Sequence, residues 1–183
     1  GGHGGHGEHG SGVGDSHGAE VGPDGLPRKT ERVIIAGYGP VGRAVAQRLD
    51  LLGAETTIIE LNPSTVKKQG GLGRRIVYGD VSNPEVLESA GVHEADAFIV
   101  TIPDDEATMR SVRAVRDMSK TIFIAARASF LSKGLLARQL GADHVTIEEI
   151  ATAETMAEQV HREFIKRHGQ AAKGGSENPT GAT

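Results

Sequence analysis

The chain has 183 residues, which corresponds to one domain on the usual scale of roughly 100 to 200 residues per domain. Its formal net charge of -4 provides no basic surface for a nucleic-acid backbone, so we expect no nucleic-acid partner. It contains no cysteine, which excludes a disulfide framework, a thiol nucleophile and cysteine metal ligands. No apolar run approaches the roughly 20 residues that cross a bilayer.

Residues 1–30 are rich in glycine and histidine and carry few large apolar side chains. Such a segment cannot bury enough surface to offset the entropy of the chain, so we predict a flexible linker. Its histidines, His3, His6, His9 and His17, have a spacing that can chelate zinc or nickel. A glycine- and histidine-rich tether is the simpler interpretation, and we predict no metal site. A tether of this kind would join the domain to a membrane domain.

From Arg32 onward, short β-branched runs alternate with helical stretches, which predicts an α/β domain over residues 31–168. The expected strands are residues 32–37, 55–60, 74–79, 96–101, 121–126 and 143–147. Strands in this number, with helices between them, fit a doubly wound parallel six-stranded Rossmann sheet built from two mononucleotide-binding halves.

The helix boundaries are predicted from capping residues. Asn62 and Asn83 each precede a proline, so each can accept a bond from a helix N–H while the proline takes the first helical position. Acidic residues beginning at Asp104 place negative charge at the start of the fourth helix, where the helix dipole favours it. Ser129 is expected to cap the fifth helix, which should end at Gly141.

Residues 148–168 predict a long C-terminal crossover helix. Its apolar side chains recur at heptad-like spacing, at Ile150, Ala153, Ala157, Val160 and Phe164. This stripe either covers the edge of its own sheet or crosses to a second subunit, and the sequence leaves both possibilities open. The small and polar residues after His168 predict a disordered tail over residues 169–183.

The sequence GYGPVG at residues 37–42 follows a β-branched run and opens an amphipathic helix, as a phosphate-binding turn requires. Gly37 would permit the tight turn, and Gly39 would let the backbone approach a phosphate. Gly42 would let the helix pack close to the strand, and the helix N-terminus would supply donors to the phosphates. The alternative is a purely structural turn from strand to helix.

Glu60 ends the second expected strand, 18 residues after Gly42. An acidic residue at this position can accept hydrogen bonds from the ribose hydroxyls of the adenosine half and would repel a 2′-phosphate. The position therefore favours NAD(H) or a plain adenine nucleotide over NADP(H). A solvated surface glutamate is the alternative interpretation.

The third expected strand leads into YGDVSNPEVLESAGV at residues 78–92. The order GYGPVG, IIELNP, YGDVSNPEVLESAGV and ADAFIVTIPDDEAT resembles the RCK or TrkA-N family, the nucleotide-binding regulatory domains of potassium channels and transporters. The family includes the domains of Kef-type cation/proton antiporters, and the resemblance covers residues 32 to 165. It implies a doubly wound sheet, a dimer of domains and a bound nucleotide that gates a membrane ion pathway.

The resemblance also assigns ligand contacts to particular residues. The phosphate contacts fall on the glycine-rich turn and the start of its helix, at Gly37, Tyr38, Gly39, Pro40 and Val41. The ribose contact falls on Glu60, and the adenine-side contact falls on Asp80 and Val81. Thr101 ends the fourth strand, where the family also contacts its ligand. Arg127 is a candidate phosphate contact, with an ordinary surface ion pair as the alternative.

We therefore expect a nucleotide-sensing regulatory domain of a potassium or other monovalent cation/proton antiporter, or of a potassium transport system, at the cytoplasmic face of the membrane. Its expected ligand is NAD(H), AMP, ADP or ATP. Its expected partners are a second copy, bound through the C-terminal helix, and a fused or docked membrane antiporter domain. No second ligand domain follows that helix, which favours the Kef-like arrangement.

The alternative is an NAD-dependent oxidoreductase-like Rossmann protein. Such an enzyme needs a catalytic group beside the nicotinamide. The sequence has no Tyr-x-x-x-Lys pair after Tyr38 or Tyr78 and no appended substrate domain, so we predict no enzymatic activity and no catalytic residue.

Overall fold

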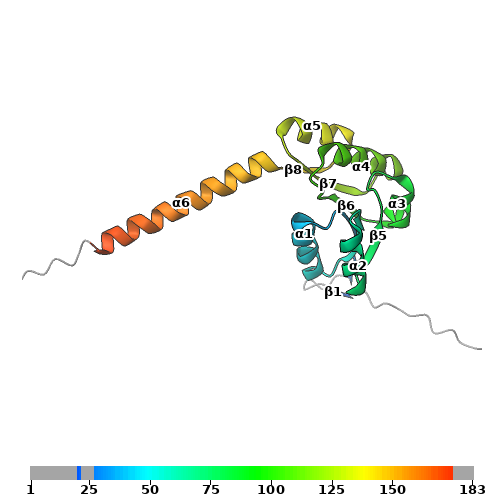
Figure 1. The fold of residues 1–183 in the computed structure, drawn as a ribbon, viewed down its shortest axis with the longest axis horizontal. Helices are drawn as coiled ribbons and strands as arrows, with labels where there is room; N and C mark the ends of the chain where they lie inside the picture. Colours follow the sequence, from blue (N-terminus) through cyan, green and yellow to red (C-terminus); the bar gives the residue numbers. More distant parts are fainter. Residues whose placement is uncertain (1–19, 22–26, 175–183) are drawn as a thin grey trace, which may run out of the picture. The chain divides into compact units, whose positions relative to one another are not determined.

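The computed structural model describes residues 20–21 and 27–174 (Figure 1). The chain divides into two units between Thr30 and Glu31. In the first unit, β1 (Glu20–Val21) pairs antiparallel with β2 (Pro27–Arg28), where the sequence predicted only a linker. The rest of that linker lies outside the described residues, and so do the four histidines that were considered as metal ligands.

The second unit contains a six-stranded parallel sheet in the order β5-β4-β3-β6-β7-β8. Its strands are β3 (Arg32–Ala36), β4 (Glu55–Glu60), β5 (Arg75–Tyr78), β6 (Ala97–Val100), β7 (Phe123–Ala128) and β8 (His144–Ile147). This order reverses direction next to β3, which is the arrangement of a doubly wound Rossmann sheet. The predicted fold class is confirmed.

The strand β7 begins and ends two residues later than predicted. Its ladder begins at Phe123, which pairs with Ala97, whereas the apolar Ile122 before it packs into the core. At the other end, Arg127 and Ala128 continue the ladder with β8. The predicted end at Ala126 is therefore too early, since pairing with β8 continues through Arg127 although its charged side chain interrupts the apolar run.

The helices of this unit are α1 (Pro40–Leu51), α2 (Pro63–Gly71), α3 (Pro84–Ser89), α4 (Asp105–Met118), α5 (Leu131–Leu140) and α6 (Glu148–Gly174), with a 3-10 turn η1 (Val92–Glu94). Figure 1 shows α4 and α5 together on one side of the strands and α1 on the other. Within the described residues, none of these helices combines the length and the apolarity needed to cross a membrane.

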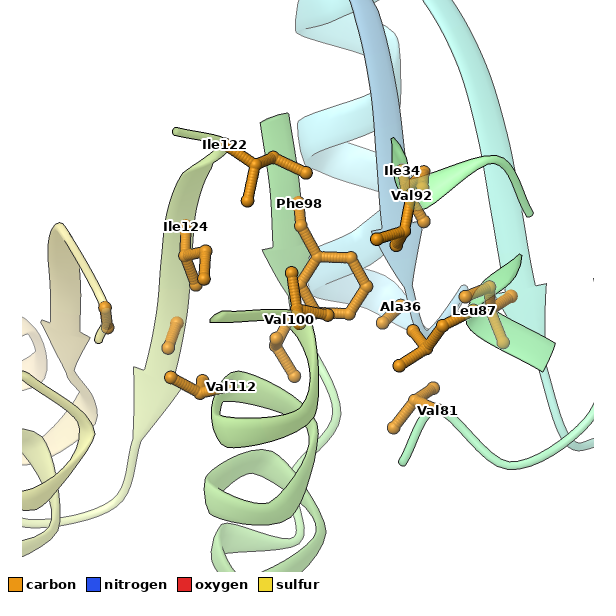
Figure 2. Packing of buried hydrophobic residues seen from close by; sticks show 14 of the residues in the cluster. Ile34, Ala36, Val81, Leu87, Val92, Phe98, Val100, Val112, Ile122 and Ile124 are labelled. Carbon is orange, nitrogen blue, oxygen red and sulfur yellow. The ribbon is translucent and has the colours of Figure 1, made fainter. Parts of the chain in front are cut away.

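Alternating side chains of β3 build two cores, one on each face of the sheet. Val33 and Ile35 pack with residues of α1. Ile34 and Ala36 pack in the larger core around the fully buried Phe98, with residues from α3, α4 and α5 (Figure 2). Burial on both faces holds the carboxyl end of β3 rigidly in the centre of the sheet.

The two predicted asparagine caps are present, and the first of the predicted acidic residues of α4 also acts as a cap. Asn62 accepts bonds from the N–H groups of Ser64 and Thr65, and Asn83 accepts one from Glu85. Asp104 caps α4 by accepting a bond from the N–H of Ala107.

The prediction for Ser129 is wrong. The N-cap of α5 is Phe130, which forms no side-chain capping bond. The N–H of Ser129 instead donates to Oδ1 of Asp105 at 3.1 Å, because the turn after β7 packs against the start of α4. This contact crosses 24 residues of sequence, so the local sequence pattern does not reveal it.

The last helix is longer than predicted, since α6 continues past His168 to Gly174. Gln170, Ala171 and Ala172 are good helix formers, which accounts for its continuation through Gly169. The predicted disordered tail is therefore helical over residues 169–174, and residues 175–183 lie outside the described part. Every residue from Thr152 to Gly174 is exposed, so the apolar stripe does not cover its own sheet.

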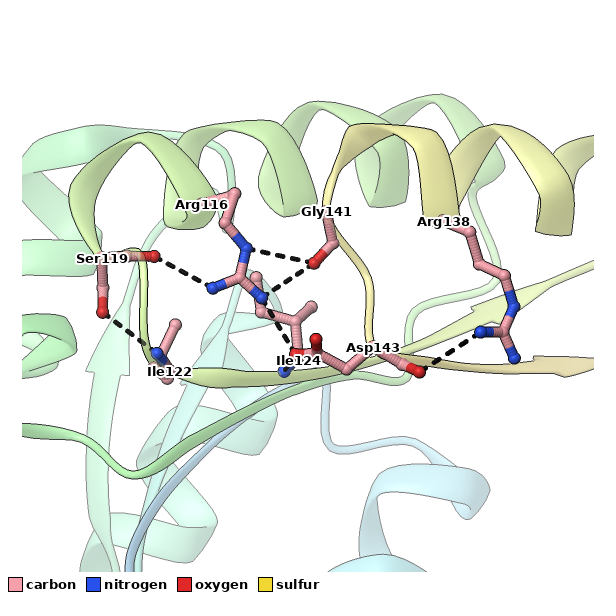
Figure 3. Close-up of polar contacts among 7 residues, drawn as sticks. All are labelled: Arg116, Ser119, Ile122, Ile124, Arg138, Gly141 and Asp143. Atoms are coloured by element: carbon pink, nitrogen blue, oxygen red, sulfur yellow. Dashed lines mark hydrogen bonds and ion pairs between the residues drawn. The ribbon is translucent and has the colours of Figure 1, made fainter.

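An arginine joins α4 to the loop before β8 (Figure 3). The guanidinium of Arg116 donates to the carbonyl of Gly141 at 3.1 and 2.8 Å and to Oδ2 of Asp143 at 2.9 Å. The same carboxylate oxygen of Asp143 accepts the N–H of Ile124 at 2.8 Å. One side chain thus connects a helix, a loop and β7.

Replacing Arg116 with alanine should lower the free energy of unfolding by about 2 kcal/mol, because a partly buried carbonyl and a carboxylate lose their charged donor. Urea denaturation would measure the change. Arg138→Ala is the matched control, since Arg138 donates one bond of 3.3 Å to the exposed Asp143 carbonyl. Equal losses of unfolding free energy in the two variants would show that the Arg116 network does not stabilise the fold.

Candidate nucleotide-binding site

The glycine-rich turn connects the end of β3 to the start of α1. Gly37 has a φ of +102°, and a Cβ there would lie 2.7 Å from Cγ2 of Ile102. A Cβ on Gly42 would lie 2.0 Å from the carbonyl oxygen of Gly37. At Gly39, by contrast, an added Cβ would meet no atom within 4 Å. Packing within the domain therefore requires Gly37 and Gly42, whereas Gly39 faces open space.

The turn leads directly into the N-terminus of α1. Gly39 is the N-cap and forms no side-chain capping bond, and Pro40 occupies the first turn of the helix. The first N–H groups of a helix have no acceptor within the helix, and the helix dipole is positive at this end. The open space at Gly39 thus lies beside donors that suit a phosphate.

A hollow of about 440 Å³ opens in front of this turn at the carboxyl ends of β3, β4 and β6. It is lined by the residues of the turn, by Glu60 and by residues that follow β4, β6 and β7, namely Gly37, Tyr38, Gly39, Pro40, Val41, Arg43, Glu60, Asn62, Thr65, Thr101, Ile102, Pro103 and Arg127. Eight of the predicted site residues line it, while Gly42, Asp80 and Val81 do not. Ligands of doubly wound sheets bind at this kind of position.

Glu60 fastens the glycine-rich turn to the end of β4. Its Oε2 accepts the N–H of Tyr38 at 2.8 Å, and its Oε1 accepts the N–H groups of Leu61 and Asn62, both at 3.0 Å. A carboxylate oxygen can accept two hydrogen bonds, so Oε2 can also accept one from a ribose hydroxyl. Glu60 is therefore a structural link within the hollow as well as the predicted ribose contact.

Asp80 and Val81 lie on the turn between β5 and α3. Val81 is 6% exposed as a whole residue, and its side chain packs with Leu87 in the larger core (Figure 2). Oδ1 of Asp80 accepts the hydroxyl of Ser82 at 2.6 Å and the N–H of Ser82 at 2.8 Å. These two bonds hold the pKa of the exposed Asp80 carboxyl below its usual range. The adenine contact at these residues stays a prediction.

Thr101 and Arg127 lie where β6 and β7 end. The buried hydroxyl of Thr101 lies 2.9 Å from the carbonyl oxygen of Gly37 and 3.1 Å from that of Ala36, so it ties β6 to the turn. Nη1 of Arg127 donates to the Thr101 carbonyl at 3.0 Å, and its Nε forms an ion pair with Glu148. For Arg127, the structure contains the ion pair and also places the side chain against the hollow.

The sequence prediction missed Arg43, a cation in the first turns of α1. Its Nε donates to the carbonyl of Tyr38 at 3.3 Å, and its guanidinium lies 5.4 Å from the centroid of the Tyr38 ring. With Arg127, it places two guanidinium groups beside the hollow, against one carboxylate from Glu60. A basic residue directly after the glycine motif was a signal that could have identified it.

Asn62 and Thr65 were also missed as lining residues. Asn62 was predicted only as the cap of α2, and its Oδ1 accepts the N–H groups of Ser64 and Thr65 at 3.0 and 3.5 Å. Because α2 begins at the carboxyl end of β4, its capping residue lies beside Glu60. The hollow thus has further polar groups on the side of Glu60.

A parallel sheet whose first strand ends in this turn, with a hollow at the point where the strand order reverses, defines a doubly wound Rossmann domain with a candidate nucleotide site. The chain belongs to the TrkA-N domain family, which it matches over residues 33–148. The predicted resemblance is confirmed.

Curated relatives include potassium transport proteins. The chain is 32% identical over 144 residues to the K(+) efflux antiporter 3, chloroplastic, of Arabidopsis thaliana, covering 74% of this chain and 19% of that protein. It is 30% identical over 118 residues to the glutathione-regulated potassium-efflux system protein KefC of Cronobacter sakazakii, covering 64% of this chain and 19% of that protein. The chain therefore spans about a fifth of the length of these relatives.

Solved structures share the fold. The TrkA-N domain of the inner membrane protein ybaL from Escherichia coli has a TM-score of 0.68 and 27% identity, covering 72% of this chain and 97% of that one. GsuK bound to ADP has a TM-score of 0.65 and 28% identity, covering 73% of this chain and 34% of that one. The GsuK channel bound to NAD has a TM-score of 0.67 and 27% identity, covering 76% and 25%.

Proposed function

We propose that this chain is the nucleotide-sensing regulatory domain of a potassium or other monovalent cation/proton antiporter, or of a potassium transport system, at the cytoplasmic face of the membrane. Its ligand is NAD(H) or an adenine nucleotide, bound in the hollow in front of the glycine-rich turn. The observation that carries this proposal is the contrast among the three glycines: Gly37 and Gly42 are closely packed, but Gly39 is open toward the hollow. The relatives named as potassium-efflux proteins and the nucleotide-bound GsuK structures support it.

In the proposed complex, the phosphates lie against Gly39, Pro40 and Val41 at the start of α1. The ribose lies beside Glu60, whose negative charge disfavours a 2′-phosphate, and the adenine extends toward Asp80. Arg43 and Arg127 lie beside the hollow, and their positive charges suit a ligand that carries a diphosphate. These positive charges favour a nucleotide over an uncharged nucleoside.

We propose that the domain binds its nucleotide without transforming it. Two polar side chains that line the hollow are already engaged by the main chain. Glu60 accepts three backbone N–H groups, and the Thr101 hydroxyl lies within bonding distance of two backbone carbonyls. These contacts suit groups that position the turn, and they support a sensor in preference to an oxidoreductase.

Gly39→Asp should abolish nucleotide binding, because its carboxylate would occupy the open space where the phosphates lie. The melting temperature of the chain, measured with AMP, ADP, ATP, NAD⁺, NADH and NADPH, tests this, since a ligand that binds only the folded state stabilises it. At about 100 times the dissociation constant, the stabilisation amounts to about 2.7 kcal/mol. We expect a shift with at least one nucleotide that lacks a 2′-phosphate, and no shift in the variant.

Gly70→Asp is the matched control, because Gly70 is an exposed glycine of α2 whose added Cβ also meets no atom within 4 Å. It should keep the full response to nucleotide. An unshifted melting temperature of the unmodified chain with all six ligands would contradict the proposal. So would an equal response from Gly39→Asp and Gly70→Asp.

We further propose that two copies associate through α6. The stripe residues Ile150, Val160 and Phe164 are 42%, 46% and 54% exposed. A helix with no packed face is marginal in water, and most helical stability in proteins comes from packing an apolar face. A second copy of α6 supplies that face. The proposed partner that responds to nucleotide binding is a membrane antiporter domain.

A further inference from the structure

Arg127 connects the nucleotide hollow to the beginning of α6. Its side chain lines the hollow in front of the glycine-rich turn and also a neighbouring, mainly apolar hollow of about 410 Å³. Glu148, the first residue of α6, lines only the second of these. The ion pair between Arg127 and Glu148 thus joins a residue of the ligand site to the root of the helix.

The root of α6 is the part of the helix that is attached to the domain. The chain enters it directly from Ile147 of β8, Glu148 pairs with Arg127, and the N–H of Glu149 donates to the carbonyl of Ser129 at 3.3 Å. From Thr152 onward, the side chains are exposed. The ion pair is therefore one of a few contacts that fix how α6 leaves the sheet.

We propose that Arg127 exchanges Glu148 for a phosphate group of the bound nucleotide, and that this exchange loosens the root of α6. The inference rests on the proposed function, since it requires a phosphate in the hollow. Two anions compete for one guanidinium, and a diphosphate carries more negative charge and more acceptor oxygens than a single carboxylate. Nη1 remains on the Thr101 carbonyl, which keeps Arg127 beside the hollow while Nε changes its partner.

The exchange makes nucleotide binding and the attachment of α6 oppose each other. A ligand that binds one arrangement more tightly shifts the population toward it. The same coupling must work in both directions, so weakening the hold of Glu148 on Arg127 strengthens nucleotide binding. This reciprocity separates an exchange from a merely structural ion pair.

Glu148→Gln should therefore bind ADP and NAD⁺, which both carry a diphosphate, about two- to five-fold more tightly than the unmodified chain, the range of a partly exposed ion pair. Calorimetry would measure the affinities. Hydrogen exchange of the amides at residues 151–156 should speed up when ADP binds to the unmodified chain. In Glu148→Gln it should already be fast without ADP and change little on binding.

Glu149→Gln is the matched control, because it removes the same charge from the same turn of α6 without touching Arg127. It should leave both measurements close to those of the unmodified chain. In an Arg127→Ala background, adding Glu148→Gln should give no further gain in affinity. A gain of the same size in that background would overturn the exchange, because the effect would not pass through Arg127.

Weaker or unchanged binding by Glu148→Gln would also overturn the exchange. Weaker binding would mean that Glu148 orients Arg127 toward the phosphate. If the unmodified chain binds ADP or NAD⁺ but the two glutamine variants behave alike, the exchange fails and the proposed function stands. If none of the nucleotides of the melting experiment binds the unmodified chain, both fail together.

Discussion

Gly42→Ala should lower the free energy of unfolding by about 3 kcal/mol, at the upper end of the cost of overpacking a tight site. The added Cβ would lie 2.0 Å from the carbonyl oxygen of Gly37 and 2.9 Å from Oγ1 of Thr101. Backbone must therefore move, and the tie between β6 and the turn is disturbed with it. Helix propensity alone would favour alanine by about 1 kcal/mol, so a loss of stability identifies the steric conflict.

Gly70→Ala provides the comparison for urea denaturation. Gly70 lies in α2, and a Cβ there meets no atom within 4 Å. It should leave stability unchanged or raise it by up to about 1 kcal/mol. If Gly42→Ala matched Gly70→Ala, the close approach of α1 to the end of β3 would not be a requirement of the fold.

Val160→Asp should convert a dimer of the chain into a monomer. A carboxylate at the centre of the apolar stripe would have to lose its water on association, which costs several kcal/mol when no partner is present. Sedimentation velocity over a range of chain concentrations would measure the change. The unmodified chain should sediment as a dimer. In the variant, the association should be weaker by at least about 100-fold, which corresponds to about 2.8 kcal/mol of binding free energy.

Thr155→Asp introduces the same charge on the opposite side of α6, where Thr155 is exposed and off the stripe. It should remain dimeric. A monomeric unmodified chain would contradict association through α6, and so would equal dissociation of the two variants.

Local patterns predicted most of the sheet and its helices. Apolar runs mark β3 and β4, and the Asn-Pro pairs at Asn62 and Asn83 mark α2 and α3, because capping depends only on neighbouring residues. The glycine turn was equally visible, since its spacing follows from the geometry of a strand that turns into a helix. These features need no knowledge of distant contacts.

The missed features depend on contacts between distant segments. Ser129 follows the rule for a capping residue, but the bond from its N–H to Asp105 joins it to α4 instead. The ladder with β8 extends β7 through Arg127, a residue that ends the apolar run in the sequence. Local propensity cannot anticipate either partner.

The candidate site was predicted in its centre and missed at its edges. Eight of the predicted residues line the hollow, because the turn and the strand ends must meet at the carboxyl edge of the sheet. The resemblance assigned an adenine-side contact to Val81, which packs in the core, and Arg43 and Thr65 line the hollow from helices. Which helical side chains reach a site depends on how each helix lies on its sheet.

The cap of α1 differs from those of its neighbours. Asn62, Asn83 and Asp104 each supply a side-chain acceptor to the first turn of a helix, whereas Gly39 begins α1 without one. Relative to glycine, a side-chain cap contributes a few tenths of a kcal/mol, so the unliganded helix begins without a stabilisation of that size. In the proposed complex, a phosphate oxygen takes the place of the missing cap, and the nucleotide completes a secondary-structure element of the domain.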